Sequence, residues 1–179
     1  MKIIFFWIAS VVVSLTSFKG YSKTMYTKST TTVLAQGQFA TSEIVSGYLK
    51  IKNALVKSDT KSATQSAKAL EAILTSSNTS QLTEAQKMEL ATILLGATKE
   101  VKNIASNSGK LDRQRKAFQM LSLHINDLLA NFGSTQKLYV DFCPMYEGGS
   151  IWLSETKDIK NPFYGAQMVT CGRIKETIK

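Results

Sequence analysis

Two short segments near the C-terminus carry most of the residues with unusual chemistry. One is Cys143-Pro144-Met145, and the other runs from Met168 to Cys171. Thiolate and thioether sulfurs are soft donors, which select Cu(I) and similar ions over hard cations. If the fold brings the two segments together, they offer four sulfurs to one ion. Cys143, Met145, Met168 and Cys171 are therefore the candidate ligands of a site for Cu(I) or a similar soft ion.

His124, the single histidine of the chain, is a candidate for a further ligand. It lies beside Leu121 and Leu128 at the flank of an apolar helical stripe, and it can reach the sulfurs if the C-terminal segment folds onto that helix. A lone histidine in such a place is more often a hydrogen-bonded structural residue. Trp152 is a weaker addition, since an indole face can shield a soft cation but more often anchors packing.

The same two cysteines can instead form a disulfide. An oxidising compartment favours that outcome, and closing a loop of this length stabilises a fold by about 3–4 kcal/mol on the chain-entropy model. Met145 and Met168 would then be ordinary gap-filling residues. The alternative to a metal-binding module is therefore a non-catalytic interaction domain stapled by Cys143–Cys171.

The composition offers little for catalysis. A Cys–His nucleophilic pair also needs an orienting group, and no motif surrounds His124. Glu147, Glu155 and Asp158 have the pattern of solvated loop acids. We expect no enzyme and no small-molecule substrate.

The net charge of +9 comes from basic residues that are scattered along the chain, with no run of five or more like charges. Nucleic-acid binding proteins usually show a clustered basic stripe and a recognition motif. We therefore expect no nucleic-acid partner, although an acidic partner stays open.

Four amphipathic helices must position these sulfurs. Apolar residues recur at steps of three and four from residue 42 to residue 132, which is typical of one buried helical face. The four stripes include Ile44, Tyr48, Ile51 and Leu55; Ala63, Ala67, Leu70 and Leu74; Leu90, Ile93, Ala97 and Val101; and Phe118, Leu121, Ile125 and Leu128.

Capping residues predict where these helices begin and end. Asp59 or Thr60 can cap the second helix, and Thr83-x-x-Gln86 is a capping box before the third. Asp112 is the predicted cap of the fourth, and Gly133 its terminator. Because short loops join the helices, neighbours must run antiparallel.

The fold class that follows is mainly α, with one domain over residues 42–179. An antiparallel, up-and-down four-helix bundle occupies residues 42–132, and an irregular or short-β cap occupies residues 134–179. Within the cap, Leu138–Cys143 alternates in the manner of a strand, and Ile151–Leu153 is its partner across a Gly148-Gly149 turn. Residues 21–41 are polar and form a flexible lead-in.

The first residues have the features of an export signal. Met1-Lys2 is followed by an apolar run from Ile3 to Val13, shorter than the roughly 20 residues that a membrane span needs. We expect residues 1–20 to be a signal peptide and the protein to be periplasmic or secreted, not embedded in the membrane after cleavage.

The chain also resembles a known family in an ordered series of motifs. These are Cys143–Met145, Trp152–Ser154, Ile159–Gly165 with its Asn-Pro-Phe-Tyr-Gly end, and Met168–Gly172. Together with the helical segments at residues 48–55 and 114–122, they are similar to an uncharacterised bacterial periplasmic family, domain of unknown function 3347. The resemblance covers about residues 42–178.

The resemblance implies a metal-related role. Such domains also occur appended to periplasmic adaptor subunits of heavy-metal efflux systems, so the implied partner is a metal-efflux or metal-delivery protein and the implied ion is copper or silver. It carries over onto Cys143, Met145, Met168 and Cys171, which stand at matching motif positions.

Overall fold

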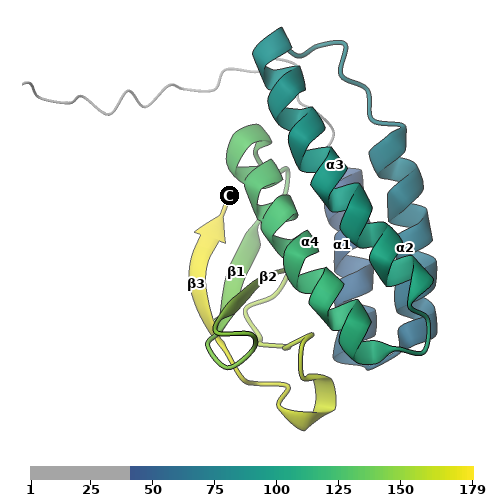
Figure 1. Cartoon of the computed structure of the whole chain (residues 1–179). Coiled ribbons are helices and arrows are strands. Elements are labelled where there is room, and N and C mark those ends of the chain that lie inside the picture. Colours follow the sequence, from purple (N-terminus) through teal and green to yellow (C-terminus); the bar gives the residue numbers. More distant parts are fainter. Residues whose placement is uncertain (1–40) are drawn as a thin grey trace, which may run out of the picture. The chain divides into compact units, whose positions relative to one another are not determined.

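The computed structural model describes residues 41–179, in which four α-helices are followed by a small sheet (Figure 1). The elements are α1 (Thr41–Val56), α2 (Thr60–Thr75), α3 (Glu84–Ser106), α4 (Leu111–Phe132), β1 (Leu138–Cys143), β2 (Ser150–Ser154), a 3-10 turn (Gly165–Gln167) and β3 (Arg173–Ile178). The predicted signal peptide and residues 21–40 of the lead-in lie outside the described residues. Helix α1 begins at Thr41, one residue before the predicted start of the domain.

Two of the predicted helix starts are confirmed. The carboxylate of Asp59 accepts a hydrogen bond from the amide of Ser62 at 2.9 Å, which satisfies one of the free N–H groups at the start of α2. At α3, the Thr83 hydroxyl accepts from the Gln86 amide while the Gln86 side chain accepts from the Thr83 amide. This reciprocal capping box fixes the start of α3.

The predicted start of α4 is wrong. The helix begins at Leu111, and Lys110 occupies the capping position without a side-chain hydrogen bond. Asp112 therefore lies in the first turn, where its carboxylate faces the positive end of the helix dipole instead of capping an amide. The end is as predicted, because α4 stops at Phe132 and Gly133 takes a φ of 77° that suits glycine.

The predicted apolar stripes form the core. Consecutive helices pack against one another, and α1 also contacts α4. Fully buried side chains from the helices include Ile44, Tyr48, Ile51, Leu55, Leu70, Leu90, Ile104, Phe118 and Leu121. The fold is mainly α, as predicted. Within residues 41–179, none of the helices combines the length and the apolar character that a membrane crossing requires.

The C-terminal segment is a three-stranded antiparallel sheet with β1 in the centre, β2 on one side and β3 on the other. The predicted pairing of β1 with a strand across the Gly148-Gly149 turn is confirmed, with Cys143 opposite Ser150. The third strand was not predicted, because Arg173–Ile178 is rich in charged residues and almost wholly exposed. Such a strand lacks the continuous apolar face by which strands are identified in a sequence.

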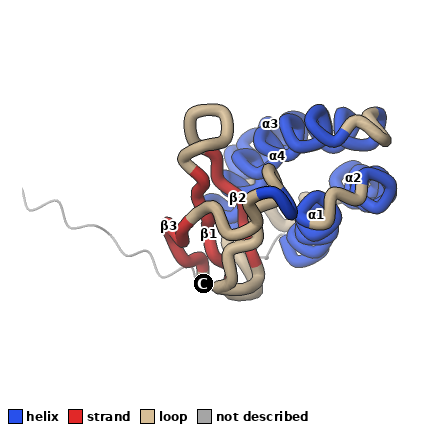
Figure 2. Tube along the Cα trace, turned by 90° about the horizontal axis from the view of Figure 1, so that it is seen from below, coloured by secondary structure: helices blue, strands red, loops and turns tan. Residues whose placement is uncertain are grey.

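The sheet packs at one side of the helices, next to α4 and α1 (Figures 1 and 2). Polar contacts fix its position. The Tyr48 hydroxyl on α1 accepts a hydrogen bond from the Leu153 amide of β2 at 3.0 Å and pairs with the Ser122 hydroxyl of α4 at 2.7 Å. Gln119 of α4 donates to the Ser150 hydroxyl at 2.8 Å. One hydrophobic core therefore includes both the helices and the sheet.

Candidate metal centre

The structure brings the two cysteines together. Cys143, the last residue of β1, is fully buried, and Cys171, in the loop before β3, is half-buried. Their sulfurs lie 3.4 Å apart and both are free thiols. A disulfide would need a separation of about 2.05 Å. The pair is therefore close without being bonded.

Sheet topology explains this proximity. In the antiparallel pairing of β1 with β3, Phe142 lies opposite Arg173. The chain thus enters β3 beside the end of β1, so the residue two positions before Arg173 arrives next to Cys143. The approach is tight, since a Cβ built on the intervening Gly172 would lie 2.7 Å from the Trp152 ring. Gly172 has a φ of 147°, which a larger residue rarely adopts.

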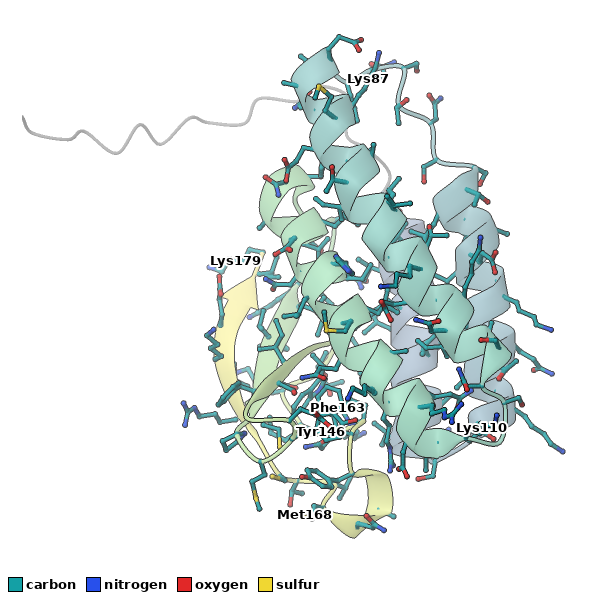
Figure 3. All side chains as sticks on the ribbon, viewed as in Figure 1. Lys87, Lys110, Tyr146, Phe163, Met168 and Lys179 are labelled. Atoms are coloured by element: carbon teal, nitrogen blue, oxygen red, sulfur yellow. The ribbon has the colours of Figure 1, made fainter. Side chains whose placement is uncertain are left out.

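The two methionines lie on the loops that carry the cysteines, but both are accessible to solvent. Met145 is 61% exposed, and its carbonyl oxygen accepts a hydrogen bond from the Tyr164 hydroxyl at 3.0 Å. Met168 is 37% exposed, and its carbonyl accepts from the Cys171 amide at 3.0 Å, so Met168 and Cys171 share one tight turn. Figure 3 places Met168 at the outer end of the C-terminal loop.

An aromatic cluster packs between these loops and helix α4. Phe163 is buried and stacks on Tyr146 with ring centroids 4.4 Å apart, and Figure 3 shows these two residues lying together. Phe163 also meets the edge of Trp152 at 5.8 Å and tilts against Phe118 of α4 at 6.1 Å. The cluster joins the Cys143 segment, the Cys171 loop and the helices through one buried side chain.

His124 and Trp152 have other neighbours. The imidazole of His124 packs on α3, where a Cβ built on Gly96 would lie 2.4–2.8 Å from three of its ring atoms. No hydrogen bond joins His124 to either thiol within residues 41–179. Trp152 is fully buried in the aromatic cluster, next to the Cys171-Gly172 peptide. Of the two, only Trp152 lies beside the loop that carries Cys171.

The candidate ligands in the two cysteine-bearing loops are sulfur donors. Among the described residues, no three histidine, cysteine, aspartate or glutamate side chains gather closely enough to hold a metal. Two thiols, with thioethers on the same loops, are the kind of donors that soft ions prefer. The hydrogen bond with Cys143 raises the pKa of the Cys171 thiol. Because metal ions bind the thiolate form, a raised thiol pKa would make metal binding at this pair weaker as pH falls.

A buried carboxyl group lies two residues before Cys143 on β1, and no pattern in the sequence indicated it. Asp141 is fully buried, and neither of its carboxyl oxygens has a hydrogen-bond partner. Burial raises its pKa to about 7, against the opposing effect of the Lys52 ammonium and with a smaller contribution from Glu155. Lys52 is itself 1% exposed and forms an ion pair with Glu155.

Comparison with known proteins gives one match. The sequence model of a family described as "Protein of unknown function (DUF3347)" matches residues 44–137, slightly more than half of the chain. No curated protein and no solved structure matches. The matched residues cover the four helices and end immediately before β1, so the two cysteines lie outside them.

Proposed function

We propose that this chain, which belongs to the DUF3347 family of proteins of unknown function, is a binding module that holds a soft metal ion through Cys143 and Cys171. The ion is Cu(I) or Ag(I). The observation that carries the proposal is the 3.4 Å separation of two unbonded cysteine sulfurs. The helices, as an up-and-down bundle, serve as the scaffold, and the role is binding without catalysis.

The spacing of the thiols supports chelation of a single ion. Metal–thiolate bonds of about 2.3 Å let one ion contact both sulfurs at separations of up to about 4.6 Å. A bent S–metal–S arrangement therefore needs the sulfurs to move apart only slightly. Cys143 is fixed at the end of a central strand, while Cys171 lies on a loop and can make that adjustment.

The methionines supply ligands that can exchange. Met145 and Met168 are exposed on the loops beside the thiol pair, and a thioether is a weaker, neutral donor than a thiolate. In the proposal they complete the coordination shell and release the ion when a partner approaches. That partner is a metal-efflux or metal-delivery protein, met in the periplasm or outside the cell.

The second candidate is the stapled interaction domain, and the same geometry favours it. Closing the disulfide requires the sulfurs to approach by about 1.4 Å from their present 3.4 Å. The bond would span 28 residues and would stabilise the fold by about 3–4 kcal/mol. Oxidation and metal binding use the same sulfurs and therefore exclude each other.

Competition for Cu(I) between the reduced protein and a coloured chelator separates the candidates. The metal module predicts one bound ion per chain, lost in Cys143→Ser and in Cys171→Ser. Met145→Leu and Met168→Leu should weaken binding, while Met88→Leu is the matched control because Met88 is 73% exposed on α3, outside the site. No saturable binding, or binding that survives both serine variants, would reject the module.

A further inference from the structure

The loop from Asn161 to Cys171, here called the cysteine loop, closes on a single buried side chain. Asn161 is 0% exposed although its side chain is an amide. Its Nδ2 donates a hydrogen bond to the Cys171 carbonyl oxygen at 2.7 Å. Its Oδ1 accepts hydrogen bonds from the amides of Phe163 at 2.8 Å and Tyr164 at 3.2 Å. One side chain thus connects the first and last turns of the loop.

The backbone of Asn161 strengthens the same closure. Its amide donates to the Val169 carbonyl at 2.8 Å, and its carbonyl accepts from the Gly165 amide at 3.0 Å. The N-terminal end of the loop is in turn fixed to α4, because the buried Arg115 guanidinium donates from Nε to the Pro162 carbonyl at 3.0 Å. Asn161 therefore links Cys171 to the part of the loop that is fixed to the helices.

We propose that Asn161 is the positioning residue that holds the Cys171 thiol opposite Cys143. It acts through the backbone of Cys171 and touches no metal. The inference deepens the proposed function, since two thiols must be held together to chelate one ion, but the pairing it describes exists with or without a metal.

Asparagine fits this role because the position needs a donor and an acceptor at once. Ionised aspartate has the same shape and keeps the acceptor for the Phe163 and Tyr164 amides, but it presents a second acceptor oxygen to the Cys171 carbonyl. Asn161→Asp therefore turns the contact at Cys171 into a repulsion and leaves the rest of the turn intact. Serine can still accept from the Phe163 amide but is too short to reach Cys171.

The test measures how strongly the two thiols pair, by equilibrating the full chain with reduced and oxidised glutathione. Formation of the Cys143–Cys171 bond consumes one glutathione disulfide and releases two glutathione thiols, and mass spectrometry after alkylation counts the two protein forms. We expect Asn161→Asp to lower this equilibrium constant by about tenfold or more, because a repelled buried polar group costs more than an absent hydrogen bond.

Arg115→Met is the control for general loss of stability. It removes the hydrogen bonds to Pro162 and Ser58 but alters neither partner of the Asn161–Cys171 contact. A merely structural role for Asn161 predicts that both variants weaken pairing in proportion to their loss in melting temperature. The positioning role predicts that, for the same fall in melting temperature, Asn161→Asp lowers the pairing constant more than Arg115→Met does. If Asn161→Asp does not fold, Asn161→Ser provides the same comparison.

The outcomes also separate this inference from the metal proposal. Weaker pairing in Asn161→Asp, in a chain whose wild type binds no Cu(I), would reject the metal module and keep the positioning role. A folded Asn161→Asp or Asn161→Ser with an unchanged pairing constant would overturn the positioning role, whatever the wild type does with Cu(I).

Discussion

Replacing Asp141 by asparagine should stabilise the protein at alkaline pH. The carboxyl group is fully buried with both oxygens unpartnered, so the folded chain disfavours its ionised form. Asparagine has nearly the same shape as the neutral acid but cannot ionise. The charged groups that act on this site are Lys52 from α1 and Glu155 after β2, and the substitution leaves both side chains unchanged.

The magnitude follows from the change in pKa. Burial raises the pKa of Asp141 from an ordinary 3.8 to about 7, and one pKa unit corresponds to about 1.36 kcal/mol. Between about pH 4 and pH 7 the unfolded chain has lost this proton while the folded chain still holds it. The stability contributed by the neutral acid is complete below pH 4 and is lost as pH rises through 7. The loss approaches about 4 kcal/mol, which is an upper bound because a buried site relaxes.

Urea unfolding of the wild type and Asp141→Asn at pH 4.5 and pH 8.5 measures this difference. The variant should gain about 2–4 kcal/mol relative to the wild type between the two pH values. Taking the difference cancels the other carboxyl groups, including Asp59 and Glu155, whose pKa values are lowered in the fold. Asp158→Asn, at an exposed loop position, is the control. A stability difference that stays constant with pH, or a variant less stable than the wild type at pH 8.5, would mean that Asp141 is not held neutral by burial.

Two further substitutions test the packing around the site. Phe163→Ala removes the ring that joins Tyr146, Trp152 and Phe118, so chemical denaturation should show a loss of about 3–5 kcal/mol; a loss below about 1 kcal/mol would mean that the cluster does not anchor the loop. Gly96→Ala places a methyl group within 2.4 Å of the His124 ring, so thermal unfolding should show a loss of about 1–3 kcal/mol. Gly96→Ala combined with His124→Ala should recover part of that loss, and no recovery would contradict the contact.

The sequence predicts the helices well because their boundaries are set by local chemistry. The Thr83–Gln86 capping box and the glycine at Gly133 act within a few residues, so they are visible in the sequence. The start of α4 was misplaced because no side chain caps it, which left Asp112 as the nearest candidate. Strand β3 was missed because its pairing depends on β1, a strand far earlier in the chain.

The site was predictable only in part. The sequence shows one cysteine in each of two segments but not that the segments meet; the pairing of β1 with β3 brings the two sulfurs together. The burial of Asp141 was not predictable, because alternation along β1 suggests that polar positions face solvent, whereas here the strand is buried along nearly its whole length. The role of Asn161 was likewise hidden, since an Asn-Pro pair indicates a turn but not a hydrogen bond to a residue ten positions later.

Copper K-edge X-ray absorption on the reduced chain loaded with one equivalent of Cu(I) identifies the atoms that bind the ion. The metal module predicts a first shell made of sulfur alone, at about 2.3 Å, since the thiols and the thioethers on the same loops are all sulfur donors. It also predicts that this shell disappears in Cys143→Ser combined with Cys171→Ser. A first shell of nitrogen and oxygen, or a sulfur shell that persists in the double variant, would contradict it.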